Sequence, residues 1–558
     1  RKEKTVKHLK VALSDSVQSK IKSIAGRICV GVFETDFTDV GAVVIDDGEL
    51  DLVNNNQISS FGIPIIVLRL DASRDISLYE NRITSIIELL SMSIDDCTSE
   101  IEKVVANYEA SILPPFFRAL SDYVGDENSQ FDCPGHQGGQ FFYKHPTGRA
   151  FYNFFGENIF RADLCNADVK LGDLLIHEGY AYDAQAHAAK VYNADKTYFV
   201  LNGTSSANKV VLNALLTPGD IILYDRNNHK SICHGGLVMS GATPIYLETA
   251  RNPFGSIGGI LDHCFDESYI RQLVAEKSPE KANAKRPIRL AVIQLGTYDG
   301  TIYNARQVVD KIGHLCDYIF FDSAWVGYEQ FIPMMKDCSP LLLELDPNDP
   351  GILVTQSVHK QQAGFSQTSQ IHKKDSHIKG QERYVDHKRF NNSFMMHAST
   401  SPFYPLFASL DVNAKIHEGE LGQTLWRECV EVAIDARKAV LKQCKYLRPL
   451  VPPIVHGKPW EEGNTQEMAC DVKYFAFEPE AKWHSFNGYG EGQYFIDPCK
   501  FQLITPGINV ETGEYEEFGI PANILANYLR ENRIIPEKCD LNTILFLMTP
   551  AESKYKMD

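Results

Sequence analysis

Residues 352–360 read ILVTQSVHK, and this stretch decides the fold that the sequence predicts. Its first four residues form a short apolar run, which is typical of a strand buried on both faces of a sheet. Lys360 follows this run closely, although lysine is rarely buried unless it is paired. A lysine that extends its ammonium to solvent at a domain surface fits the pattern as well. The stretch therefore predicts a core strand followed by either a functional or a surface lysine.

Similar short apolar runs precede this one along the chain. Several are separated by gaps of helix length, and residues 205–216 are themselves predicted to be helical. This alternation is the signature of a mostly parallel sheet, in which ligands bind at the carboxyl ends of the strands. The predicted strands are 197–201 (TYFVL), 220–224 (DIILY), 244–247, 289–295 (RLAVIQL) and 318–321 (YIFF).

Polar side chains follow two of these predicted strands directly. The first strand leads into NGTSSAN at 202–208, where Thr204 and Ser205 either bind an anion at a helix N-terminus or cap that helix. The second leads into DRNNHKS at 225–231. A single histidine is a weak signal, so His229 is interpreted either as a stacking and acid–base group or as a structural hydrogen bonder.

The ends of the predicted strands at 318–321 and 352–355 complete an ordered set. Asp322 follows the strand 318–321 and is either a functional carboxylate or the cap of the next helix, and Ala324 and Trp325 come next. The order is then a phosphate-type turn, a histidine, an aspartate and Ser357-x-His-Lys. A pyridoxal-phosphate site needs this set: hydroxyls at a helix N-terminus for the phosphate, a carboxylate for the pyridine nitrogen, and a lysine amine for the aldehyde. The pattern predicts that cofactor and no metal.

Composition narrows the class of protein. The 558 residues are too many for one hydrophobic core, so two or three domains are expected. A net charge of −17 argues against general nucleic-acid binding. Thirteen cysteines without CxxC pairs suit a reducing cytoplasm, and no apolar run approaches the roughly 20 residues of a membrane span.

The N-terminal residues predict a separate small module. Apolar runs at 27–33, 40–45 and 63–70 alternate with helical patterns, among them 83–92, and this favours a small parallel α/β unit over residues 1–105. A helical stretch at 99–124, interrupted by Pro114-Pro115, predicts a linker helix over 106–130. From residue 131 onward the sequence becomes rich in Gly, His, Asn and Asp, and this change predicts the start of the large domain.

The motifs together resemble the bacterial ornithine/lysine/arginine decarboxylases of the aspartate-aminotransferase fold. SVHKQQAGFSQTS at 357–369 resembles the cofactor-lysine motif of that family, and FDCPGHQGG, LNGTSSANK, FDSAWVGYEQFIPMM and DPCKF resemble it in the same order. Two stretches, 296–319 and 366–380, look closest to the ornithine branch. The resemblance covers residues 36 to the C-terminal end.

This resemblance implies the architecture and the residue roles. It implies an α/β fold with a mostly parallel seven-stranded sheet, a flavodoxin-like wing at 1–105, a cofactor-binding large domain at 131–400 and a smaller α+β domain at 401–558. Lys360 would hold pyridoxal 5'-phosphate covalently, Asp322 would pair with the pyridine nitrogen, and His229 would stack on the ring. The remaining expected cofactor contacts are Ala324 and Trp325 at the ring, and Thr204, Ser205, Ser357, His359 and a neighbouring subunit's Ser399 at the phosphate.

The sequence leaves more than one hypothesis open for the substrate, the oligomeric assembly and the catalytic activity. The resemblance implies a cytoplasmic homodimer with shared active sites, possible stacking of dimers, and ornithine as substrate, with lysine or arginine as alternatives. Family members usually continue into a further C-terminal domain, which is expected to be absent here, so a catalytically silent regulatory partner is a second hypothesis. A third alternative is an aminotransferase of the same fold. It would need an arginine to bind the substrate α-carboxylate, and Arg389 is a candidate. Asp497 and Glu491 are the candidates for binding the distal ammonium of the substrate.

Overall fold

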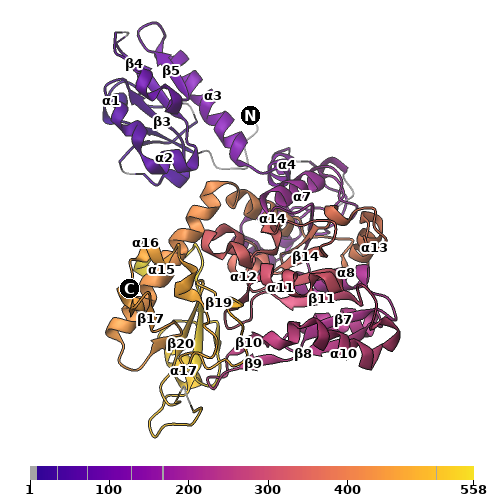
Figure 1. The fold of residues 1–558 in the computed structure, drawn as a ribbon. Helices are drawn as coiled ribbons and strands as arrows, with labels where there is room; N and C mark the ends of the chain where they lie inside the picture. The colour runs from indigo at the N-terminus through magenta and orange to yellow at the C-terminus, as the bar shows by residue number, and fades with distance from the viewer. Residues whose placement is uncertain are drawn as a thin grey trace. The chain divides into compact units, whose positions relative to one another are not determined.

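The computed structural model describes residues 9–24, 26–33, 35–71, 73–126, 128–165, 169–509 and 512–557. The chain separates into two compact units, Arg1–Leu164 and Cys165–Asp558. This division lies downstream of the predicted boundary at residue 131. Figure 1 shows the helices and strands of each unit.

The first unit contains a parallel five-stranded sheet with the order β2-β1-β3-β4-β5. This order is the flavodoxin-like one, as the sequence predicted for the wing. The central strand β3 and its neighbour β4 are almost wholly apolar because both of their faces are covered. The strands are β1 (Lys10–Leu13), β2 (Cys29–Gly31), β3 (Val40–Asp46), β4 (Ile65–Arg69) and β5 (Ser85–Glu88).

Two details of this unit differ from the sequence prediction. The helical pattern predicted at 83–92 is wrong, because residues Ser85–Glu88 form β5 and pair with β4. A short apolar run fits both periodicities, and only the neighbouring strand decides between them. The boundary predicted after residue 105 falls inside α3 (Ile94–Ile112), whose Ile101 and Val105 pack into the core of the sheet. The next helix, α4 (Pro115–Gly125), begins at the predicted proline pair.

The second unit is built on a seven-stranded sheet with the order β6-β15-β14-β13-β11-β7-β8. Only β15 runs antiparallel to its neighbours, so the predicted mostly parallel sheet is confirmed. Its parallel strands place their carboxyl ends at one edge. The strands are β6 (Lys196–Val200), β7 (Ile221–Asp225), β8 (Thr243–Leu247), β11 (Ile288–Gln294), β13 (Cys316–Ser323), β14 (Gly351–Gln356) and β15 (Ser369–Lys374).

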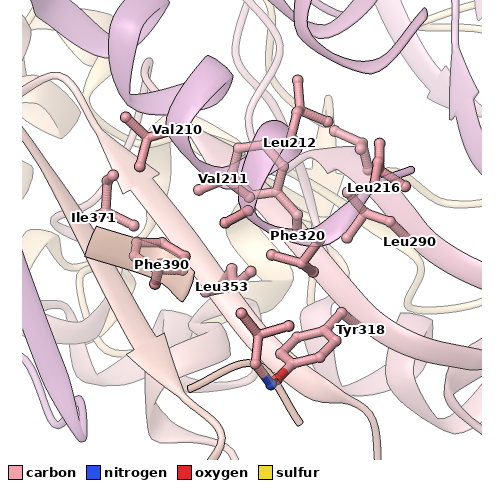
Figure 2. Packing of buried hydrophobic residues seen from close by; sticks show 14 of the residues in the cluster. Val210, Val211, Leu212, Leu216, Leu290, Tyr318, Phe320, Leu353, Ile371 and Phe390 are labelled. Atoms are coloured by element: carbon pink, nitrogen blue, oxygen red, sulfur yellow. Dashed lines mark hydrogen bonds between the residues drawn. The ribbon is translucent and has the colours of Figure 1, made fainter. Parts of the chain in front are cut away.

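Helices α8 (Gly203–Leu215) and α13 (His387–His397) cover one face of this sheet. Val210 and Val211 of α8 and Phe390 of α13 pack with Phe320 and Leu353 of the strands, as Figure 2 shows. Burial of each such side chain stabilises the fold by roughly 1.5–3 kcal/mol. This packing fixes the N-terminus of α8 at the edge of the sheet where the strands end.

The C-terminal part of the second unit is an α+β layer. The antiparallel sheet β16-β20-β22-β21 packs near α15 (Glu420–Gln443) and α17 (Ala522–Glu531). Strand β12 (Thr301–Tyr303) lies in the connection between β11 and β13 and pairs with β19 (Tyr494–Ile496). This pairing links the C-terminal layer to the large sheet. The four strands are β16 (Arg448–Pro449), β20 (Lys500–Ile504), β21 (Lys538–Cys539) and β22 (Thr543–Leu547), and the other long helices of the unit are α7 (Tyr180–Val191), α10 (Glu267–Lys277), α11 (Ala305–Ile312) and α14 (Tyr404–Ile416).

None of the helices in the described part of the chain combines the length and apolar character that crossing a bilayer requires.

Candidate active site

Lys360 lies in α12 (Val358–Gln361), a single helical turn that follows β14, rather than on the strand itself. Its Nζ is 3.6 Å from the centre of the Trp325 ring. The pKa of the Lys360 amine is lowered to about 8, chiefly by burial and in part by Lys500, while Asp322 and Glu537 act in the opposite direction. An amine with a depressed pKa is available as a nucleophile near neutral pH.

Asp322 lies near the carboxyl end of β13 and is only 2% exposed. Its Oδ2 accepts a hydrogen bond from Asn208 Nδ2 at 2.9 Å, and its Oδ1 accepts one from the amide of Ala324 at 3.1 Å. These two donors fix the orientation of the carboxylate. Asp322 also interacts electrostatically with both Lys360 and His229. The three predicted catalytic side chains therefore converge.

His229 stands at the N-cap of α9 (Lys230–Cys233). Its Nδ1 lies 2.8 Å from Ser231 Oγ and accepts from the Ser231 amide at 3.2 Å. Ser231 Oγ in turn accepts from Asn208 Nδ2 at 3.0 Å. Because Nδ1 accepts, the proton of the neutral ring lies on Nε2. Burial lowers the pKa of His229, which favours that neutral form.

The hydroxyl group of Thr204 sits in the first turn of α8. It lies 2.7 Å from Ser357 Oγ and 2.9 Å from Ser369 Oγ, and all three residues are buried. Gly203 begins the helix at φ +74°, a conformation that favours glycine. Ser205 is exposed at the same turn. Hydroxyl groups gathered at the N-terminus of a 13-residue helix suit a phosphate.

His359 and Ser399 are the two remaining predicted phosphate ligands. His359 is adjacent to Lys360 and shares a hydrogen bond of 2.8 Å between its Nδ1 and the carbonyl oxygen of Thr368. Ser399 is exposed and lines a mostly apolar cavity of about 220 Å³ with Phe403 and Phe407. The same cavity is lined by Asn202, two residues before Thr204, so Ser399 lies in the region that leads to the phosphate-type turn.

The structure also identifies residues that the sequence interpretation missed. Asn208 connects Asp322 to Ser231, whereas the sequence pattern indicates only that it lies at the start of a helix. Tyr298 stacks on Trp325 with ring centres 4.0 Å apart, and its hydroxyl donates to Glu537 Oε1 at 2.8 Å. No local sequence pattern indicates the role of these residues. Glu537, for example, lies far along the chain from the strand ends.

The two residues predicted to bind the distal ammonium, Asp497 and Glu491, lie in different surroundings. Asp497 is buried and its carboxylate already binds Lys500 Nζ at 2.9 Å and the Tyr328 hydroxyl at 2.7 Å. Glu491 is exposed. Arg389, the residue that an aminotransferase would need, is exposed on α13 and lines another pocket with Arg286.

The donor set fits pyridoxal phosphate. Lys360 supplies a partly buried amine, Asp322 an oriented carboxylate, and Thr204 and Ser357 neighbouring hydroxyl groups. Fold and site together define a pyridoxal-phosphate-dependent amino-acid enzyme of the aspartate-aminotransferase type.

Comparison with known proteins specifies the family. Residues 114–556 match the model of the major domain of Orn/Lys/Arg decarboxylases. The chain is 64% identical over 551 residues to an ornithine decarboxylase of Haemophilus influenzae, covering 99% of this chain and 76% of that protein. It is 62% identical over 551 residues to the inducible ornithine decarboxylase of Escherichia coli, covering 98% and 75%. The chain therefore belongs to the ornithine/lysine/arginine decarboxylase family.

A solved structure supports the fold. Lysine decarboxylase A from Pseudomonas aeruginosa superimposes with a TM-score of 0.87 at 30% sequence identity, covering 99% of this chain and 77% of that one. The backbone is thus shared between enzymes named for different substrates, so the fold alone does not choose the substrate.

Proposed function

We propose that this chain decarboxylates L-ornithine to putrescine and CO2, as a step of polyamine synthesis, with pyridoxal 5'-phosphate held by Lys360. The observation that carries the proposal is the convergence of Lys360, Asp322 and His229 at one edge of the sheet. The sequence identity of 64% to an enzyme named for ornithine, against 37% to one named for lysine, supports ornithine as the substrate.

When bound, pyridoxal phosphate supplies an electron sink for the pair of electrons left on Cα as the carboxylate departs as CO2. Lys360 would hold the cofactor through its amine and release it to the substrate amine. Asp322 would keep a proton on the pyridine nitrogen, and the bonds from Asn208 and the Ala324 amide hold its carboxylate in place for this task. Thr204 and Ser357 would bind the phosphate.

His229 is proposed as the residue that stacks on the cofactor ring and returns a proton to Cα, with Lys360 as the alternative acid. Its Nδ1 is occupied by Ser231, so the proton available for transfer is the one on Nε2. Loss of CO2 and protonation of Cα leave the diamine, and one proton is consumed in each turnover.

Glu537 is the proposed partner of the distal ammonium of ornithine. It is the acidic side chain of the C-terminal layer that acts electrostatically on Lys360. Tyr298 orients it through the hydrogen bond of 2.8 Å and also stacks on Trp325. Asp497 is not proposed for this role, because its carboxylate is already bound to Lys500 and Tyr328 inside the fold.

The active unit is proposed to be a cytoplasmic homodimer. Ser399 is exposed beside an apolar cavity, which suits a residue that reaches a neighbouring subunit's phosphate. The thirteen free thiols suit a reducing compartment.

A product assay tests the function. Purified protein with added pyridoxal phosphate is given equal amounts of ornithine, lysine and arginine, and the amines formed are identified by mass spectrometry. Putrescine as the dominant product is expected. Cadaverine or agmatine would keep the chemistry and correct the substrate, and bound cofactor without any amine would favour a silent regulatory homologue.

A further inference from the structure

A buried ion pair lies behind the proposed active site. The side chains of Lys500 and Asp497 are 0% and 1% exposed, and their charged atoms are 2.9 Å apart. Asp497 is fully engaged, because its Oδ2 also accepts from the Tyr328 hydroxyl at 2.7 Å and its Oδ1 accepts from the amide of Cys499 at 2.9 Å. A buried pair with each partner satisfied is held in one geometry.

The ammonium of Lys500 also donates to the carbonyl oxygen of Trp325. Trp325 is the residue whose indole ring lies 3.6 Å from Lys360 Nζ. The next residue after Lys360 is anchored to the same region, since Gln361 Nε2 donates to the carbonyl oxygens of Cys499 at 3.3 Å and Met548 at 3.2 Å. Cys499 and Lys500, at the entry to β20, therefore contact the helix that carries Lys360 and the turn that carries Trp325 respectively.

We propose that Lys500 is a positioning residue of this site, which holds the Trp325 turn against Lys360 and places a second cation beside the Lys360 amine. The proposed decarboxylation does not use Lys500, since its ammonium is bound to Asp497 and Trp325. The inference rests on the proposed function only in taking Lys360 as the cofactor lysine.

The charged surroundings of Lys360 set the direction of the expected effect. Asp322 and Glu537 favour the protonated amine, whereas Lys500 disfavours it, and the amine also interacts electrostatically with His229. Removal of the Lys500 charge should therefore make Lys360 harder to deprotonate.

The test measures the reactivity of Lys360 in cofactor-free protein. An amine-reactive label is applied over a series of pH values, and labelling of the Lys360 peptide is followed by mass spectrometry. Two variants are compared with the unaltered chain: Lys500→Met, and Lys500→Met combined with Asp497→Asn. The double variant avoids leaving a buried carboxylate without a counter-ion, which would destabilise the single variant.

In both variants the pH of half-maximal labelling is expected to rise, by roughly half a unit or more. A rise in the single variant alone would assign the effect to the unpaired charge of Asp497 and overturn the proposal. An unchanged profile in the folded double variant would overturn it as well. The labelling test uses neither cofactor nor substrate. Its result can therefore be interpreted even if the chain does not decarboxylate ornithine.

Another buried ion pair of the same unit provides the matched control. Lys373 and Asp375 are each 4% exposed and lie 3.2 Å apart, and Lys373 contacts Val385 rather than the Trp325 turn. Lys373→Met combined with Asp375→Asn should leave the labelling profile of Lys360 unchanged. An equal shift in this control would mean that the effect reports general loosening of the fold, which would contradict a positioning role for Lys500.

Discussion

The ammonium nitrogen of Lys360 lies 3.6 Å from the centre of the Trp325 ring. The two residues come from neighbouring strand ends, since Trp325 follows β13 and Lys360 follows β14. An aromatic face that close stabilises the charged amine, while burial disfavours it. Lys360 is thus held in a site where its charge is finely balanced, which is the property that a cofactor-binding lysine needs.

Lys360→Ala should abolish covalent attachment of pyridoxal phosphate and lower the rate of decarboxylation by roughly 10³-fold or more. The reason is that the Lys360 amine lies against the Trp325 ring and interacts with Asp322, whereas the nearby ammonium of Lys500 is bound to Asp497 and the Trp325 carbonyl oxygen. Cofactor attachment is measured by reduction with borohydride and mass spectrometry. The exposed Lys379→Ala serves as control and should behave as the unaltered protein does.

Asp322→Asn should retain most of the bound cofactor but lower kcat by roughly 10²–10³-fold, because an amide no longer stabilises the positive charge of the pyridine ring. The substitution keeps the shape of the side chain and an oxygen for the Ala324 amide. Cofactor affinity and steady-state kinetics separate the two effects. Unchanged kcat with full cofactor occupancy would remove Asp322 from the proposed mechanism.

Asn208→Leu should destabilise the protein by about 1–3 kcal/mol, because buried partners lose their hydrogen bonds. Asn208 is 1% exposed and bonds to Asp322, Ser231 and Thr355. It should also lower kcat, since Asp322 loses a donor. Urea denaturation and kinetics are measured on the same variant. A loss of stability with full activity would show that Asn208 acts on the fold alone.

Glu537→Gln should raise KM for ornithine by roughly 10- to 100-fold, as expected when a hydrogen bond to a charged group is lost. The cofactor should still bind, because Glu537 contacts Tyr298 rather than the expected phosphate ligands. Glu491→Gln is the matched control, since that exposed carboxylate was the alternative candidate. Equal effects of the two substitutions would reject Glu537 as the specific partner.

Glu329 should give stability a measurable pH dependence. Burial raises the pKa of its carboxyl group from 4.5 to about 7, with Asp497 acting in the same direction. Between these two values the folded state binds more protons than the unfolded state, so stability should fall as pH rises from about 4.5 to about 7. Glu329→Gln should remove this decline and be more stable than the unaltered chain above pH 7. Thermal denaturation over that pH range measures the difference, and parallel curves for both proteins would contradict the prediction.

Much of the fold could be predicted because its signals are local. Short apolar runs separated by helix-length gaps indicated the mostly parallel sheet, and the residues after each run, among them Asp322 and His229, were predicted to meet at one edge. The segment Ser85–Glu88 was predicted as helix because four residues carry too little pattern, and its pairing with β4 decided otherwise.

The order of chemical groups at the strand ends, and the resemblance to the family, therefore follow from local amino-acid patterns alone. Only the tertiary structure decided which side chains support those groups: Asn208 between Asp322 and Ser231, Glu537 beside Tyr298, and Lys500 against the Trp325 turn. These contacts join residues that lie far apart in the chain, and the packing of the C-terminal layer brings them together. Periodicity reports only which face of an element is buried, so it carries no record of the partner that each buried polar group finds across the fold.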